Sequence, residues 1–197
     1  YTNIQVALNA ATSGTVVRLS GHTFALASGL VWTVSDVTLE GGYEGTAATG
    51  PGSRDPELWP TCITRTGGVM RLLWARRLTN ATIDGVTFSN GYMQAASASA
   101  IYDGAGLRVE SNLNFTLRNC RILNCTLYNS TDHHQGRGAG VWVNACTNFA
   151  LLDSQIAGNY SYGDQWHNRG FAGGVMALGS GGIISNCQFL SNRARAS

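Results

Sequence analysis

The chain has 197 residues, only 12% of them charged, and a formal net charge of +2. Such a small charge argues against nucleic acid or an anionic membrane surface as the partner. No run approaches the roughly 18 consecutive apolar residues that a membrane span needs. The sequence therefore gives no sign of nucleic-acid binding or of a direct membrane span.

Residues 3–11 predict one short amphipathic helix, because their apolar side chains fall on one helical face: Ile4, Ala7, Leu8 and Ala11. In the rest of the chain, short β-branched and aromatic runs alternate with turns rich in Gly, Asn, Ser and Thr. This pattern is typical of an all-β domain. Because an open end of stacked strands exposes apolar layers, we expect the helix to cap the N-terminal end.

Residues 44–60 contain all three prolines of the chain, in a stretch rich in Gly, Ala and Thr. Proline removes hydrogen bonds from a strand ladder, and such a composition is typical of loops. We therefore interpret this stretch as a surface insertion.

From residue 69 to residue 192 the sequence repeats itself about every 34 residues. The last glycine of a GAG or AGG motif falls at Gly106, Gly140 and Gly174, and a second motif begins with an apolar residue at positions 83, 117, 151 and 184. A fixed period of this size is typical of a solenoid, in which each repeat buries its apolar face against its neighbours. We predict one β-solenoid domain over residues 1–197.

Each period is longer than a turn of three short strands, which needs roughly 22 to 25 residues. The surplus falls in three polar segments that do not resemble one another: residues 90–103, 124–137 and 158–171. We predict that they form lateral loops on one side of the stack. Alternation within the strands also predicts interior columns, one of which contains Phe88, Ile122, Ile156 and Phe189.

The five cysteines show neither a C-x-x-C motif nor paired histidine ligands, so we expect no metal site and no cofactor. We interpret them chiefly as small buried apolar residues. Three of them are the candidates for any disulfide: Cys120, Cys125 and Cys146.

The helix leading into Gly14–Leu19, followed by Gly41-Gly42-Tyr43, resembles the start of right-handed parallel β-helices of the pectin-lyase-like superfamily. The glycine motifs together with Phe189–Asn192 are similar to the repeats of polymorphic outer-membrane proteins and related adhesin-type surface proteins. The resemblance implies a right-handed parallel β-helix of about five to six coils. It also implies an extracellular or cell-surface location.

Enzymes occur among proteins of this fold, but the chain shows no catalytic group. Acid–base glycoside hydrolysis needs two carboxylates on one face, and none of the eleven acids forms an adjacent pair. The outer strand positions carry Arg108, Trp142 and Met176 instead of clustered acids. We therefore expect no catalytic residue and no enzyme activity, with a polysaccharide-active lyase or glycoside hydrolase as the alternative.

The loops offer the candidate ligand site. Counting back from the repeat glycines aligns Tyr128 with Tyr162 and His133 with His167, and aromatic rings beside planar donors are suited to sugars. The same residues also fit simple loop packing or a subunit interface. The candidate ligand-binding residues are Tyr128, Asp132, His133, His134, Arg137, Tyr162, Asp164, Trp166 and His167.

Asn-x-Ser/Thr motifs mark five candidate glycosylation sites in a secreted protein: Asn80, Asn114, Asn124, Asn129 and Asn159. The hypothesis that fits these observations is a non-catalytic structural or adhesive module of an extracellular or cell-surface protein, with a filament or appendage subunit as its extension. A glycan-binding module is a further alternative. We expect other subunits, or a continuing chain beyond residue 197, at an open C-terminal end, and surface glycans as further partners.

Overall fold

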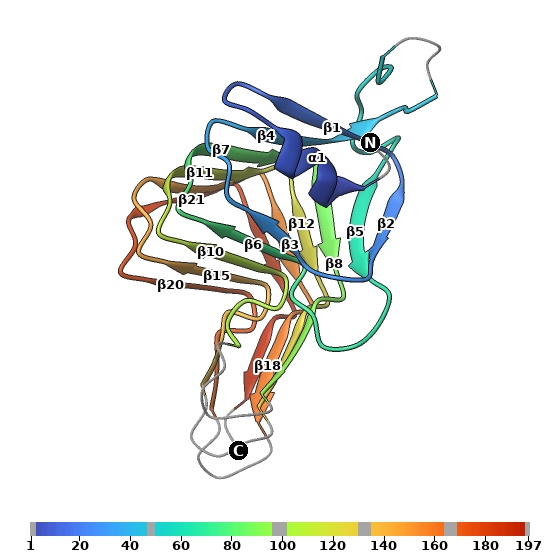
Figure 1. The fold of residues 1–197 in the computed structure, drawn as a ribbon. Coiled ribbons are helices and arrows are strands. Elements are labelled where there is room, and N and C mark those ends of the chain that lie inside the picture. The colour runs from blue at the N-terminus through green and yellow to red at the C-terminus, as the bar shows by residue number, and fades with distance from the viewer. Residues whose placement is uncertain (1–2, 47–49, 96–101, 130–134, 164–168, 196–197) are drawn as a thin grey trace.

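The protein is an all-β parallel solenoid with one short helix (Figure 1). The computed structural model describes residues 3–46, 50–95, 102–129, 135–163 and 169–195. Three sheets, A, B and C, form the walls of the stack, and in the described part of the chain their strands pair in parallel. The predicted β-helix is therefore confirmed, while its right-handed winding stays a prediction.

The strands of each wall follow one another along the stack. Sheet A contains β1 (Val16–Ser20), β4 (Thr38–Tyr43), β7 (Thr79–Asp84), β11 (Leu113–Arg118), β16 (Phe149–Leu152) and β21 (Gly182–Ser185). Sheet B contains β2 (Thr23–Leu26), β5 (Thr61–Arg65), β8 (Val86–Ser89), β12 (Arg121–Leu123), β17 (Gln155–Ala157) and β22 (Gln188–Leu190). Sheet C contains β3 (Leu30–Trp32), β6 (Leu73–Arg76), β10 (Leu107–Glu110), β15 (Val141–Asn144) and β20 (Val175–Leu178).

The strand register reproduces the sequence period. In sheet C, Leu73, Leu107, Val141 and Val175 are consecutive partners, so each step is one repeat of 34 residues. The expectation of five to six regular coils needs a correction, because only about three turns follow this period. Nearer the N-terminus the steps are irregular: Thr38 pairs with Val16 on one side and with Thr82 on the other.

The core is a set of columns that run along the stack. Phe115 and Phe149 stack with nearly parallel rings 6.5 Å apart, and the edge of Trp32 meets Phe115. The predicted column of Phe88, Ile122 and Ile156 is fully buried, and the strand register extends it to Phe189. Period-two alternation therefore identified the inward side chains correctly.

Tight corners between the sheets rely on left-handed backbone, which asparagine tolerates better than most residues. Asn80, Asn114 and Asn148 all have φ near +55°. Their side-chain amides form a ladder in which Asn148 donates to Asn114 and Asn114 donates to Asn80. Asparagine thus serves the corner in two ways: it tolerates the left-handed backbone, and its side chain forms hydrogen bonds there.

Helix α1 (Ile4–Ala10) lies across the N-terminal end of the stack and buries Ile4, Ala7 and Leu8. Asn3 caps it by accepting hydrogen bonds from the backbone N–H groups of Gln5 and Val6. The helix packs beside β3, where the Gln5 amide donates to the Val31 carbonyl and accepts from the Val31 N–H. The predicted helix is present, and it covers the edge of sheet C.

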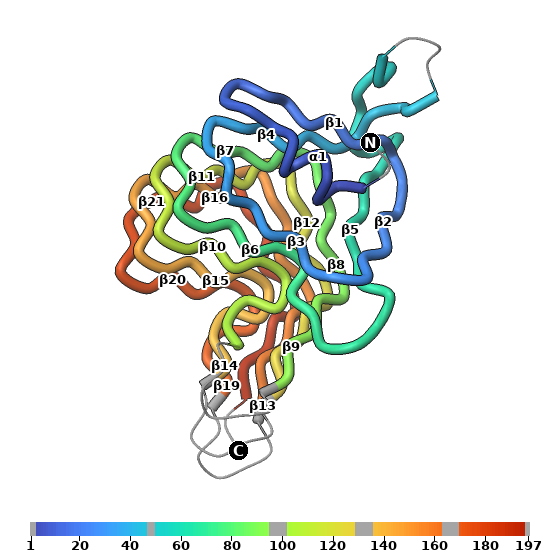
Figure 2. The backbone as a smooth tube through the Cα atoms, viewed as in Figure 1, coloured from blue at the N-terminus to red at the C-terminus, as the bar shows by residue number. Residues whose placement is uncertain are grey.

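The surplus residues of each period form an arm rather than irregular loops (Figure 2). Four strands make parallel sheet D: β9 (Tyr92–Ala95), β13 (Thr126–Asn129), β18 (Tyr160–Gly163) and β23 (Arg193–Arg195). Two more make sheet E: β14 (Gln135–Arg137) and β19 (Arg169–Phe171). The segments leave the stack on one side, as expected, and they continue its register outward.

All five cysteines are free thiols, so the disulfide candidates Cys120, Cys125 and Cys146 are not bonded to one another. These three are buried and occupy corner columns, where the backbone N–H of Cys120 donates to Ser154 Oγ and that of Cys125 donates to Asn159 Oδ1. Burial raises the pKa of Cys120 and of Cys125 to about 12. The interpretation as buried packing residues is confirmed for these three, whereas Cys62 and Cys187 are partly exposed.

Candidate functional site

The outer surface of sheet D gathers aromatic and planar polar side chains in two adjacent columns. The first column holds Tyr92, Thr126, Tyr160 and Arg193, and the second holds Gln94, Tyr128, Tyr162 and Arg195. Residues two apart on a strand point to the same face, so both columns share one side of the arm. We call these eight residues the tyrosine face.

The opposite side of sheet D is closed. Leu127 and Ser161, which alternate with the residues of the tyrosine face, are both fully buried. The Ser161 hydroxyl donates a 2.9 Å hydrogen bond to the Gly136 carbonyl of β14. Sheet E therefore covers this inner side, and the tyrosine face is left as the outer surface of the arm.

The rings of the tyrosine face lie against one another. Tyr160 and Tyr162 stack with centroids 4.5 Å apart and planes 15° apart, and the Tyr128 ring lies 4.9 Å from that of Tyr162. All three residues are partly exposed. Tyr128 and Tyr162 lie on neighbouring strands, which are about 4.8 Å apart, and Tyr160 lies on the same strand as Tyr162. Sheet D therefore holds the three rings against one another.

Arginines add positive charge at the borders of this face. The Arg65 guanidinium lies 5.3 Å from the centre of the Tyr92 ring and donates to the carbonyls of Asn90 and Gly68. Burial, with the nearby Tyr162, raises the pKa of Tyr92 above its usual value despite Arg65. Its hydroxyl thus stays protonated at neutral pH and donates to Gln94. Arg193 and Arg195 are exposed at the last strand, and none of the eight residues carries a carboxylate.

The structure brings together two of the predicted ligand residues and separates a third. Tyr128 and Tyr162 are direct register partners, as the repeat spacing predicted. Arg137 is engaged elsewhere: it forms an ion pair with Asp103 and lies over the Trp142 ring. The other predicted ligand residues lie outside the described part of the chain: Asp132, His133, His134, Asp164, Trp166 and His167.

Six residues of the tyrosine face were not among the predicted ligand residues: Tyr92, Gln94, Thr126, Tyr160, Arg193 and Arg195. The signal was present, because the steps from Tyr92 to Thr126 and on to Tyr160 follow the same 34-residue period. These segments were predicted as lateral loops because, apart from this spacing, they do not resemble one another.

A hollow with a volume of about 680 Å³ lies at the corner between sheets A and B. Three successive turns contribute equivalent triplets to it, beginning at Asn119, Asp153 and Asn186, and the insertion adds Arg54 and Glu57. We call it the corner groove. Both Glu57 carboxylate oxygens accept hydrogen bonds from Arg121.

The buried carboxylate beside the corner groove is Asp84. It accepts from Arg54, Arg118 and Asn119 at 2.8 to 2.9 Å. Burial alone would raise the pKa of Asp84, but the hydrogen bonds of Asn119 and Arg54 and the two positive charges outweigh it and lower the pKa below its usual value. Asp84 is consequently ionised at neutral pH and has no proton to give a glycosidic oxygen.

The five glycosylation motifs fall in different environments. Asn159 is fully buried, and its amide donates to the carbonyl of Ile122. Asn80, Asn114 and Asn124 are exposed at corners with left-handed backbone. Asn129 is the last residue of β13. An enzyme acting on the folded protein therefore meets the Asn80, Asn114 and Asn124 side chains but not that of Asn159.

Within the described ranges, no helix is long and apolar enough to cross a membrane, and no three His, Cys, Asp or Glu side chains are grouped to hold a metal ion. Comparison of the chain with protein-family models, curated proteins and solved structures found no match.

Proposed function

We propose that this chain is a non-catalytic adhesive module that binds glycans through the tyrosine face of sheet D. The observation that supports this best is the cluster of Tyr128, Tyr160 and Tyr162, in which the partly exposed rings of Tyr128 and Tyr160 lie 4.9 Å and 4.5 Å from that of Tyr162 on one side of sheet D. A tyrosine face of this kind is suited to a flat, extended ligand.

The chemistry of the face fits a sugar polymer. A pyranose ring has an apolar C–H face that packs on an aromatic ring, and its hydroxyl groups need planar donors and acceptors at the rim. The phenolic hydroxyls, the Gln94 amide and the guanidinium groups of Arg193 and Arg195 supply these. Because three of the four strands of sheet D carry tyrosine rings on this face, a ligand with repeating units can contact several rings at once.

The ion pairs of the structure support a non-catalytic role. Asp103 is buried, and its carboxylate accepts hydrogen bonds from Arg137 at 2.9 and 3.0 Å. Asp84 is held in the same manner by Arg54 and Arg118. Asp84, fixed between two guanidinium groups, is a poor general acid, because the positive charges favour its ionised form.

The location outside the cell is part of the proposal. It rests on the resemblance of Gly41–Tyr43 and Phe189–Asn192 to motifs of pectin-lyase-like and adhesin-type surface proteins. Glycans are abundant on cell surfaces, so an adhesive module is the role in which a rigid stack and a glycan-binding arm serve together.

A glycan array tests the proposal. We expect the wild-type chain to bind a subset of extended polysaccharides, and the double variant Tyr128→Ala/Tyr162→Ala to lose at least about tenfold in affinity, since two stacking contacts are removed. The double variant Tyr128→Phe/Tyr162→Phe keeps the rings and should retain most of the binding.

A matched control comes from Trp59→Ala, which removes a partly exposed aromatic ring from the insertion, outside the arm. Equal binding by the wild type and the double alanine variant would refute the proposed site. Release of reducing or unsaturated sugar from the same glycans would refute the non-catalytic role and support the polysaccharide-active enzyme instead.

A further inference from the structure

The outer face of sheet C carries a column in which indole rings and a guanidinium group alternate. Trp74, Arg108 and Trp142 are consecutive register partners on β6, β10 and β15. The Arg108 guanidinium lies 5.1 Å from the centre of the Trp74 ring and 4.6 Å from that of the Trp142 ring. The guanidinium of Arg137, from β14, lies 5.8 Å from the centre of the same Trp142 ring. Two guanidinium groups therefore border one indole.

The indole N–H of Trp142 is buried without a hydrogen-bond partner. Only 3% of the Trp142 surface is exposed, and Nε1 has no acceptor within reach. Among the described residues, no other fully buried side-chain nitrogen or oxygen lacks a partner. Because buried polar groups are nearly always paired in folded proteins, this donor indicates an acceptor that comes from outside the described chain.

Trp74 shows how the same kind of donor is satisfied elsewhere in the column. Its indole N–H donates at 3.2 Å to Glu110 on the next strand, and the same carboxylate accepts two hydrogen bonds from Arg108. In the register of sheet C, the position that Glu110 holds relative to Trp74 is held by Leu178 relative to Trp142. The repeat thus keeps the indole donor at Trp142 but lacks its carboxylate.

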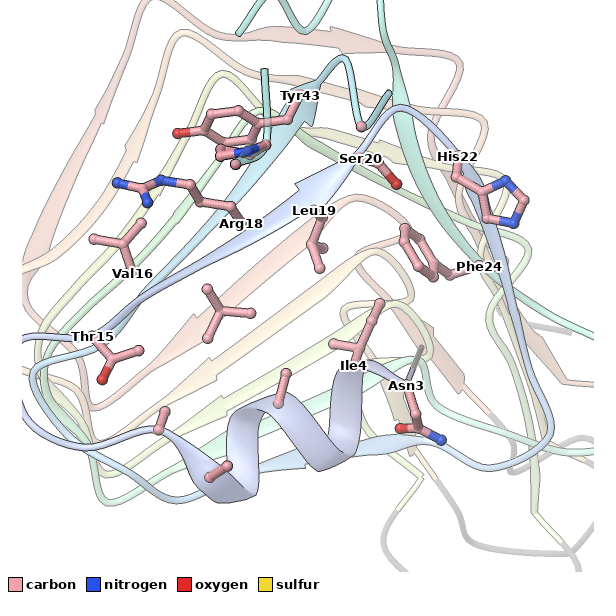
Figure 3. Close-up of a pocket in the computed structure, with 17 residues that line it drawn as sticks. Asn3, Ile4, Thr15, Val16, Arg18, Leu19, Ser20, His22, Phe24 and Tyr43 are labelled. Carbon is pink, nitrogen blue, oxygen red and sulfur yellow. The ribbon is translucent and has the colours of Figure 1, made fainter. Parts of the chain in front are cut away.

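A second aromatic donor of the structure is paired in the same way. At the rim of a cavity of about 700 Å³, Arg18 lies beside Tyr43 (Figure 3), with its guanidinium carbon 5.9 Å from the ring centre. The Tyr43 hydroxyl donates a 2.6 Å hydrogen bond to the Glu40 carboxylate. An aromatic donor, a guanidinium group and a carboxylate thus occur together at Tyr43 and at Trp74. At Trp142 the carboxylate is missing.

The charged groups around this column carry an excess of positive charge. Those that act on one another in the described part of the chain are Arg71, Arg108, Arg137, Asp103 and Glu110. Burial, together with the nearby Arg108 charge, lowers the pKa of Arg71 to about 10. Hydrogen bonds with described residues occupy Nε and Nη2 of both Arg108 and Arg137, and they leave Nη1 of each without an acceptor. An anion beside Trp142 therefore meets both positive charge and unused N–H donors.

We infer that the outer face of sheet C binds a small organic acid, whose carboxylate accepts a hydrogen bond from the Trp142 indole N–H, with Nη1 of Arg108 and Arg137 as the neighbouring donors. The ligand carboxylate takes the place that Glu110 holds beside Trp74. Met176 is the register partner of Trp142 on β20, and its flexible side chain can move aside to admit the ligand. The inference is independent of the tyrosine face, which shares no residue with this site.

Two-dimensional NMR of the indole N–H groups tests the site, with sodium acetate replacing sodium chloride at constant ionic strength. The Trp142 signal, assigned by its absence from the Trp142→Phe variant, should move downfield and reach saturation, because its N–H gains a charged acceptor. The Trp74 signal is the internal control and should stay in place, since its N–H already donates to Glu110. A Trp142 signal that does not move, or that moves without saturating, would overturn the inference.

The variant Leu178→Glu supplies the missing carboxylate from the chain itself. Its Trp142 signal should lie downfield before acetate is added, and its affinity for acetate should fall at least about tenfold, because the donor is already occupied. Ile183→Glu is the matched control: it adds the same charge at an exposed position of sheet A and should bind acetate as the wild type does. Circular dichroism checks that both variants keep the fold. Unchanged acetate binding by Leu178→Glu, or an equal loss in both variants, would refute the site.

Discussion

Asn159 joins neighbouring turns through one buried side chain. Its Oδ1 accepts from the Cys125 N–H, and its Nδ2 donates to the Ile122 carbonyl and to Asn192 Oδ1. Backbone polar groups at a buried corner have no access to water. The amide therefore replaces the hydrogen bonds that the chain cannot make with itself where it turns.

The substitution Asn159→Leu keeps the size of the side chain and removes these bonds. Each buried group left without a partner costs about 1–3 kcal/mol, so the free energy of unfolding should fall by about 2–5 kcal/mol in urea denaturation. The control is Asn148→Gly, which removes an exposed ladder bond and accommodates the left-handed backbone. Equal losses in both variants would contradict the role of the buried amide.

Asp84 makes stability depend on pH in a defined direction. The pKa of Asp84 is lower in the folded than in the unfolded chain. Its contribution to the free energy of unfolding is therefore complete above the ordinary carboxyl pKa of about 3.9. That contribution is lost as pH falls through the lowered pKa of the folded chain. At pH 7 the free energy of unfolding of the Asp84→Asn variant should be about 2 kcal/mol lower than that of the wild type. The difference should shrink in acid, and a pH-independent difference would count against the ion-pair account.

At the scale of the element, the GAG motif specifies two different backbone requirements. Its first position has left-handed backbone, with φ of +65° at Gly104 and +63° at Gly138, and Ala172 is forced to +53° at the same place. Its third position lies against the next turn: a Cβ added to Gly140 would be 2.7 Å from the Gly174 carbonyl oxygen. The period therefore comes from backbone geometry as well as from the core.

Two substitutions, compared by chemical denaturation, test these two backbone requirements of the GAG motif. Ala172→Gly should stabilise the fold by about 0.5–1 kcal/mol, because relief of a left-handed alanine exceeds the entropy that glycine adds to the unfolded chain. Gly140→Ala should destabilise it by about 1–3 kcal/mol, since the added methyl group meets a carbonyl. Loss of stability in Ala172→Gly would show that the left-handed backbone there is not strained.

The strands of the stack were predictable from sequence because their inward residues are apolar and repeat at a fixed distance. The arm was not. In β13 only Leu127 is apolar and inward, and the matching position of β18 is Ser161, whose burial depends on a hydrogen bond to Gly136. Short strands that bury polar groups carry no alternation signal, so the segments that form the tyrosine face looked like loops.

At the scale of the whole molecule, the stack divides into an axis and a lateral arm. The axis repeats a closed apolar core along its length. The arm repeats aromatic rings across its outer surface, which suit a ligand with repeating units. One period of the sequence thus sets the spacing of both.

Saturation-transfer NMR on a polysaccharide found by the array tests the central claim, glycan binding by the tyrosine face, most directly. With the aromatic protons of the protein irradiated, ring C–H protons of the sugar should receive strong saturation from the wild type. They should receive little from the Tyr128→Ala/Tyr162→Ala variant. Undiminished saturation in that variant would contradict the claim, because the sugar would then lie on another part of the molecule.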